Sequence, residues 1–299
     1  MEILPYEPAM ADQLTAAYNS AIRRVPHCYP VSTTELTAAL AEDHGLRGRQ
    51  VFVASEGQSI VGFAHAGVGC REQEESPEQG LIQFFWYAPG RRQTGQALLE
   101  ITEGHLRAHG MRQAVAFHQE YRYPFYHLCS AYLSDRLGQV AALLGYNGYR
   151  RIGGEVYLDW PDFEPIEPPP AEVSADIALE WMPGRGARPG LILRAFQNDE
   201  WIGVCKCVSC GEFSAADEVQ DWLFTTWLNV QEDLQSKGLG RHLLRRALLE
   251  MQAVGYRHAS ISTAVDNYRA ALFYTNFGYH VVDWTYGLGR KLEGGCDAQ

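Results

Sequence analysis

The stretch LNVQEDLQSKGLGRHL, residues 228–243, decides the fold of this 299-residue chain. It runs from an apolar strand through a turn with two glycines into an amphipathic helix. At the start of a helix the backbone N–H groups have no intrahelical acceptor and form the positive end of the helix dipole. Gly238 and Gly240 would let a diphosphate approach the main chain without meeting a Cβ atom. The stretch therefore predicts an anion-binding turn.

A second copy of this pattern lies in the first half of the chain. The segment FWYAPGRRQTGQALLE, residues 85–100, aligns with it without a gap, so that Tyr87, Arg92, Gly95 and Ala97 fall on Val230, Gln235, Gly238 and Gly240. Each segment continues into a helix that ends in glycine, and the next strands begin alike, with GMRQA at 110–114 and GYRHA at 255–259. Each copy later reaches a Gly-Tyr pair, at 148–149 and 278–279. Three correspondences in one order predict a duplicated domain.

The segment 161–176, PDFEPIEPPPAEVSAD, separates the two copies. It holds five prolines and five acidic residues without a basic one, a composition typical of a linker. We therefore predict a first domain at 1–160 and a second at 177–299. Hydrophobic periodicity predicts a strand near 3–6, helices over 9–22 and 33–41, and strands over 50–54 and 60–67 in the first half. In the second half it predicts strands over 177–181, 191–196 and 201–209, with no room for helices after the first of them.

The turn and the strand before it resemble the Q/R-x-x-G-x-G/A motif and the L-x-V strand of the GNAT acetyltransferase superfamily. The next block of that family resembles DNYRAALFY, residues 266–274, followed by Phe277-Gly278-Tyr279 and terminal strands over 281–284 and 286–292. The resemblance covers residues 190–292 well and 1–158 more loosely. It implies an α/β (α+β) protein of two tandem GNAT-like domains, each a mixed, mostly antiparallel twisted sheet flanked by helices.

The same resemblance implies acetyl-CoA as a cosubstrate and assigns the residues that bind it. Its pyrophosphate would bind the main-chain amides of the turn, which are those of Gln235, Ser236, Lys237, Gly238, Leu239, Gly240 and Arg241. The strand end at Leu228 and Val230 would take the acetyl carbonyl and the pantetheine amides. Asn267 would bind the pantetheine arm or cap the following helix.

Tyr274 is the expected catalytic residue, as the acid that protonates the departing thiolate. A thiol titrates near ~8.5 and a phenol near ~10, so this proton transfer costs little free energy. No general base stands out. Glu232 and Asp233 follow the strand, and Glu212 and Asp217 are no better supported, while a chain of water molecules would also serve.

The first copy offers a second cofactor site at Arg92, Gly95 and Ala97. In that copy the positions that match Asn267 and Tyr274 hold Leu137 and Leu144. Because leucine cannot donate a proton, we expect the N-terminal domain to be catalytically degenerate, although it could still hold a coenzyme.

The composition of the chain limits the classes of molecule that it is expected to bind. A formal net charge of −11 disfavours general nucleic-acid binding and favours an amine substrate. The sequence lacks a signal peptide and an apolar run long enough for a membrane span, which predicts a cytoplasmic protein that does not bind membranes. The seven cysteines are expected to be free thiols, and Cys205, Cys207 and Cys210 lack a fourth ligand, so no metal site is predicted. A homodimer is compatible with these features.

The sequence therefore predicts an N-acetyltransferase that moves an acetyl group directly from acetyl-CoA to a primary amine of a small molecule or peptide. One alternative is a non-catalytic acyl-CoA-binding module. Another is a thiol-cofactor biosynthetic acetyltransferase that resembles mycothiol synthase in layout. The acceptor is not identified by the sequence, because variable loops build such pockets.

Overall fold

The computed structural model of the chain describes residues 1–42, 45–69, 78–168 and 170–292. By its contacts the chain divides into two units. The first unit holds Met1–Glu155 together with the C-terminal residues from Asp283 onward, and the second holds Val156–Val282. Two strands, β7 (Arg150–Trp160) and β13 (His280–Lys291), have residues in both units.

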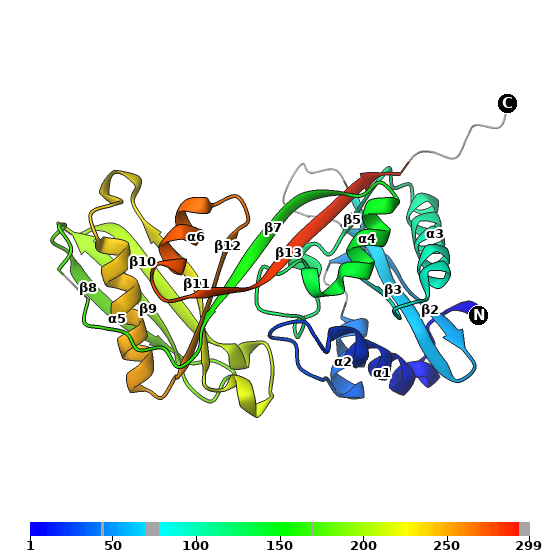
Figure 1. The fold of residues 1–299 in the computed structure, drawn as a ribbon, viewed down its shortest axis with the longest axis horizontal. Coiled ribbons are helices and arrows are strands. Elements are labelled where there is room, and N and C mark those ends of the chain that lie inside the picture. The colour runs from blue at the N-terminus through cyan, green and yellow to red at the C-terminus, as the bar shows by residue number, and fades with distance from the viewer. Residues whose placement is uncertain (43–44, 70–77, 169, 293–299) are drawn as a thin grey trace. The chain divides into compact units, whose positions relative to one another are not determined.

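The first unit is a mixed sheet with helices on both faces (Figure 1). Its strands follow the order β1-β2-β3-β4-β5-β13, in which β4 and β5 are parallel and the other registered pairs are antiparallel. The bounds are β1 (Glu2–Pro5), α1 (Ala11–Ile22), α2 (Thr33–Ala41), β2 (Leu46–Glu56), β3 (Ser59–Gly69), β4 (Gln79–Tyr87), α3 (Arg92–Ala108), β5 (Gln113–Ala116), β6 (Leu133–Ser134) and α4 (Gly138–Tyr146). α2 begins at a capping box, in which Ser32 and Glu35 each accept a backbone N–H of the other.

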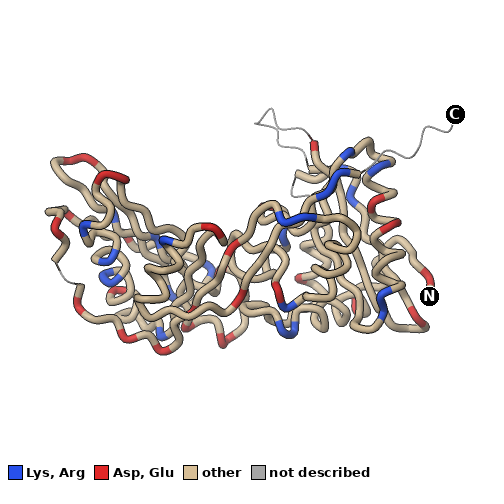
Figure 2. The backbone as a smooth tube through the Cα atoms, turned by 45° about the horizontal axis from the view of Figure 1, so that its top comes forward, with Lys and Arg blue, Asp and Glu red and all other residues tan. Residues whose placement is uncertain are grey.

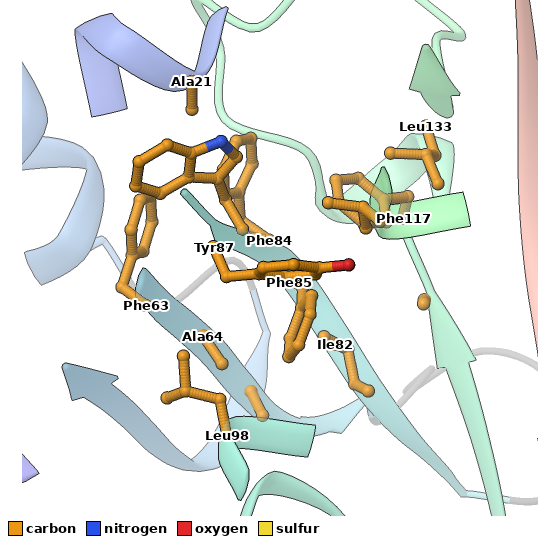
Figure 3. Packing of buried hydrophobic residues seen from close by; sticks show 14 of the residues in the cluster. Ala21, Phe63, Ala64, Ile82, Phe84, Phe85, Tyr87, Leu98, Phe117 and Leu133 are labelled. Carbon is orange, nitrogen blue, oxygen red and sulfur yellow. The ribbon is translucent and has the colours of Figure 1, made fainter. Parts of the chain in front are cut away.

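Aromatic side chains fill the core of the first unit. Phe84 of β4 stacks on Phe63 of β3, with ring centroids 5.2 Å apart, and also contacts Tyr18 of α1 at 5.3 Å. Figure 3 shows Phe63 and Phe84 side by side in this cluster. Tyr87, further along β4, instead lies beside Gly95 of α3. Alternate residues of a strand point to opposite faces of the sheet. Phe84 therefore faces α1, and Tyr87 faces α3 on the other side.

The second unit repeats the central part of this arrangement. Its strands follow the order β12-β11-β10-β9-β8, with β11 and β12 parallel and the others antiparallel. The bounds are β8 (Asp176–Met182), β9 (Gly190–Gln197), β10 (Glu200–Ser209), β11 (Trp222–Val230), α5 (Leu239–Ala253), β12 (His258–Ala264) and α6 (Tyr268–Thr275). Asn198 and Asp199 have φ values of 52° and 66°, as the two-residue turn between β9 and β10 requires.

The end of the chain differs from the prediction of two terminal strands over 281–284 and 286–292. These residues form one continuous strand, β13. Asp283 and Thr285 are buried while Trp284 and Tyr286 are partly exposed, so the alternation continues across the expected break. No proline interrupts it, and the chain therefore has no local reason to turn there.

Charge and hydropathy are distributed as in an ordinary globular protein. Lysine and arginine residues are interspersed with aspartate and glutamate along the described chain (Figure 2). Among the described residues, no helix is long and apolar enough to cross a membrane. The fold class is as predicted, with mixed sheets flanked by helices.

Candidate active site

The turn between β11 and α5 presents a row of backbone amides. Gly238 is the N-cap of α5 in the left-handed conformation, with φ 86°, and Ser236 also has a positive φ, of 65°. The first backbone hydrogen bond of the helix joins the His242 N–H to the Gly238 carbonyl. Among the described residues, the amides of 237–241 donate no hydrogen bond to a protein acceptor. They form the positive end of the dipole of α5, a helix of 15 residues, and this end favours the binding of an anion.

A cavity of about 720 Å³ opens at this turn. Nine of the residues assigned to the coenzyme line it, namely Leu228, Val230, Gln235, Ser236, Lys237, Gly238, Gly240, Arg241 and Asn267. Leu239 does not, because its side chain is buried under α5. A Cβ atom on Gly240 would have Val230 Cγ2, at 3.7 Å, as its nearest neighbour, so the space beside Gly240 is open.

Six further residues, to which the sequence assigned no individual binding role, line the same cavity, namely Pro170, Glu172, Asn229, Arg269, Ala270 and Phe273. Arg269 and Phe273 are four residues apart on α6, one helical turn, and this spacing could have indicated them. Pro170 and Glu172 belong to the proline-rich segment. The Glu172 N–H donates to the Lys237 carbonyl at 3.0 Å. No pattern in the sequence predicts this contact.

Side chains hold the turn in shape. The Gln235 side-chain amide donates to the Val230 carbonyl at 3.0 Å and so ties the turn to the end of β11. Its oxygen accepts from Arg269 at 2.7 Å, and Arg269 also donates to the Ser236 hydroxyl at 2.9 Å. Arg269 thereby joins the N-terminal part of α6 to the turn. Asn267 caps α6, since its side-chain oxygen accepts from the Ala270 N–H at 3.2 Å.

Tyr274 lies behind the wall of the cavity rather than in it. Its side chain is 7% exposed, and its ring centroid lies 5.4 Å from that of Phe273, a lining residue, and 6.2 Å from that of Tyr279. Burial raises the pKa of Tyr279 well above its ordinary value, and the nearby thiol of Cys207 adds to the effect. The Tyr279 phenol therefore stays protonated at neutral pH beside Tyr274.

Four acidic residues were considered above as candidates for the general base. Glu232 and Asp233 are exposed in a short 3-10 helix before the turn, and Asp217 is exposed in another. Glu212 accepts the Arg185 N–H at 2.6 Å. None of the four lines the cavity.

The cysteine motif of β10 packs inside the second unit. Cys205, Cys207 and Cys210 are buried thiols that are not in disulfides, and the Cys207 sulfur lies 3.5 Å from the Thr225 hydroxyl oxygen. Cys28 and Cys129 are not in disulfides either. The remaining two cysteines, Cys70 and Cys296, lie outside the described residues.

The matching region of the first unit is built differently. α3 begins at Arg92, which aligns with Gln235, so this helix starts four positions earlier than α5 does. Gly95 lies inside the helix and its N–H donates to the Arg91 carbonyl at 3.1 Å. Ala97 lies further along α3, whereas its match, Gly240, is in the first turn of α5. The Gly95 amide is thus not free for a ligand.

Tyr87 closes the gap beside this helix. Its ring lies where a Cβ on Gly95 would meet it at 2.6 Å, and its hydroxyl donates to the Gln139 carbonyl of α4 at 2.8 Å. Val230, the matching residue of β11, makes no such bridge because it has no polar atom in its side chain. Burial raises the pKa of the Tyr87 phenol. A cavity of about 390 Å³ remains outside this bridge, where the Arg92 guanidinium lies 4.8 Å over the Tyr146 ring.

Comparison with known sequences yields one family. The profile of the Acetyltransferase (GNAT) family matches residues 155–279, which contain the turn, the cavity and Tyr274. No curated protein matches the chain in sequence.

Comparison with solved structures extends the similarity to the whole chain. A tandem GNAT protein from the clavulanic acid biosynthesis pathway superposes with a TM-score of 0.68 at 13% identity, over 99% of both chains. A GCN5-related N-acetyltransferase from Sphaerobacter thermophilus gives 0.63 at 14% identity, over 99% of this chain and 97% of the other. A GCN5-related glucosamine N-acetyltransferase region of a fungal multi-domain β-N-acetylglucosaminidase gives 0.65 at 13%, over 97% of this chain and 38% of that one. At these identities the similarity concerns the fold.

Proposed function

We propose that the chain is a tandem-domain member of the GNAT superfamily and that it transfers an acetyl group directly from acetyl-CoA to a primary amine of a small molecule or peptide. The observation that carries the proposal is the turn between β11 and α5. Its amides are free at a helix N-terminus, and the space beside Gly240 would admit a diphosphate.

The residues of the second unit divide the work of binding. The amides of 237–241 hold the pyrophosphate of the coenzyme, and Arg241 and Lys237 add positive charge at the same cavity. The end of β11 at Leu228 and Val230 binds the pantetheine arm and orients the thioester carbonyl. Asn267 and Gln235 have structural roles: Asn267 caps α6, and Gln235 anchors the turn to β11.

The chemical step forms a bond between the amine nitrogen and the carbonyl carbon and then breaks the bond from carbon to sulfur. Tyr274 donates its phenolic proton to the departing sulfur and then takes up a proton from solvent. The amine attacks in its neutral form and releases one proton to solvent as the amide forms. For this role the sulfur must reach the Tyr274 hydroxyl behind Phe273, so the acyl end of the coenzyme enters deeper than the described cavity.

In this proposal the first unit has a structural role and does not catalyse acetyl transfer. Leu144, at the position of Tyr274, is fully buried, and Tyr146 nearby is 75% exposed on another face of α4. Tyr87 bridges β4 to α4 where the coenzyme arm would enter. The alternatives are a non-catalytic acyl-CoA-binding module, which the test below separates from a transferase, and an enzyme of thiol-cofactor biosynthesis.

The test combines calorimetry with an assay of thiol release. We expect one acetyl-CoA site per chain, and Gly240→Asp should weaken binding by roughly 10²-fold because it crowds the diphosphate and adds like charge. Gly104→Asp is the matched control, since Gly104 is exposed on α3 with open space around it. Unchanged affinity of the Gly240 variant would refute the assignment. Binding without release in the presence of any amine would favour the non-catalytic module.

A further inference from the structure

The two units share a β-bulge at matching positions. In the first unit His65 of β3 pairs with Phe84 of β4, and Gln83 is the extra residue of the bulge. In the second unit Lys206 of β10 pairs with Trp227 of β11, and Thr226 is the extra residue. Phe84 and Trp227 occupy the same place relative to the glycine turn, because both copies align without a gap there. The bulge fixes which side chains point to the face opposite the coenzyme helix.

In the first unit this face is closed. Phe84 is 1% exposed, and it packs against Tyr18 of α1 and against Tyr123, whose ring centroid lies 5.6 Å away. His65 is also buried, and its Nδ1 lies 3.0 Å from the Tyr123 hydroxyl oxygen. α1 and the segment after β5 supply this cover.

In the second unit the same face is open. Trp227 is 61% exposed, although β11 is an interior strand with neighbours on both sides. The two α-helices of this unit, α5 and α6, line a cavity together. On the face of the sheet opposite Lys206 and Trp227, a Cβ atom on Gly203 would meet Leu243 of α5 at 3.2 Å. No α-helix within the described residues 156–282 matches α1, so nothing from this unit covers the indole.

Lys206 lies beside Trp227 on this open face. It is half-buried and forms no ion pair with any described residue. Glu180, the acidic residue of the same row of the sheet, is bound by Arg194 at 2.5 Å. The bulge residue Thr226 donates its hydroxyl to the Lys206 carbonyl at 3.2 Å and so holds the backbone in place. The open face thus offers an apolar ring next to an uncompensated ammonium.

We infer that Trp227 and Lys206 form the acceptor site, and that the acceptor is a primary amine that also carries a carboxylate and an apolar or aromatic portion. This inference rests on the proposed function, in which the coenzyme fills the α5 side of β11. The amine must then approach the thioester from the other side of the strand, where Trp227 adjoins Leu228.

The chemistry of the two residues sets the class of acceptor. A simple cationic amine would be repelled by Lys206, whereas a carboxylate on the acceptor pairs with it. The same ammonium favours the neutral form of a nearby amine, which is the form that attacks the thioester. Trp227 adds a flat apolar surface for the rest of the acceptor.

Matched amines that differ by one carboxylate test the inference. The rate of thiol release from acetyl-CoA is measured with L-tyrosine against tyramine, and with L-phenylalanine against 2-phenylethylamine. In the wild-type protein kcat/KM should favour the carboxylated member of each pair. Lys206→Met should lower kcat/KM for that member by roughly 10- to 100-fold, as for a lost charged contact, with a smaller effect on the other member. Lys206→Arg should retain the preference.

Trp227→Ala should lower kcat/KM for both members while the calorimetric affinity for acetyl-CoA is unchanged. Lys291→Met, an exposed position of β13, is the control for the loss of a lysine. Equal rates for the two members in the wild type, or an equal effect of Lys206→Met on both, would overturn this inference and leave the proposed function standing. Failure to acetylate any amine would overturn the proposed function, and the inference with it.

Discussion

Single residues differ in how far the sequence could place them. The spacing of Gly238 and Gly240 behind an apolar strand predicts the amide turn, and the structure places both glycines in it. The burial of Tyr274 behind Phe273 could not be predicted, because helical spacing gives a face but not the depth of a side chain within the fold. The hydrogen bonds of Arg269 could not be predicted either, since its partners, Gln235 and Ser236, lie more than thirty positions away.

Tyr274→Phe is the decisive change at this scale. It removes one hydroxyl and keeps the ring that packs on Phe273 and Tyr279. We expect kcat to fall by roughly 10²-fold with little change in the affinity for acetyl-CoA, as when a positioned proton donor is lost. Tyr268→Phe on the same helix, at a position 76% exposed, should leave kcat unchanged. Near-normal turnover of the Tyr274 variant between pH 6 and 9 would make water the proton source.

Among the elements, the two helices that follow the turns show the limit of sequence alignment. The copies align without a gap, yet α3 begins four positions earlier than α5 relative to that alignment. Tyr87 packs against Gly95 and favours a continued helix there, while Gly238 in the left-handed conformation delays the start of α5. A local motif does not show long-range packing of this kind. The alignment therefore predicted a cofactor turn at Arg92, Gly95 and Ala97, whereas these residues lie within α3.

A variant of Arg92 tests whether the first unit takes part in transfer. Gly95→Asp is unsuitable, because its Cβ would meet the Tyr87 ring at 2.6 Å and disturb folding. Arg92→Ala removes the charge over Tyr146 and leaves the helix intact. We expect unchanged kcat and one coenzyme site per chain by calorimetry. Its match in the other copy, Gln235→Ala, should weaken coenzyme binding because the turn loses its anchor to Val230. Loss of turnover in a normally folded Arg92 variant would give the first unit a catalytic part.

Across the whole molecule, stability should depend on acidic groups held within the first unit. Asp283 is buried, and its His127 neighbour lies 3.2 Å away with no exposed surface. Burial and the nearby Asp283 carboxylate raise the pKa of Asp135 to about 6, and burial also raises that of Asp283. The folded state therefore binds protons more tightly than the unfolded chain does, and ionising these groups opposes folding as pH rises from about 4 to 6.

Asp135→Asn should remove part of this dependence. The thermal midpoint of the variant minus that of the wild type should be more positive at pH 7 than at pH 4.5, because an amide cannot ionise. Circular dichroism melts over this range measure the difference, with Asp176→Asn, an exposed position, as the control. A difference that stays constant with pH, or that grows as pH falls, would contradict the raised pKa.

The last strand has a consequence for how the protein is made. Residues 288–291 of β13 pair with β5 of the first unit, so that unit is assembled from segments more than 170 positions apart. A ribosome delivers the partner of β5 only after it has translated the whole of the second unit, which ends at Val282. Until then the nascent first unit has an open sheet edge beside β5, a surface prone to pairing with other chains. Completion of the N-terminal unit must therefore wait for synthesis of the C-terminal strand.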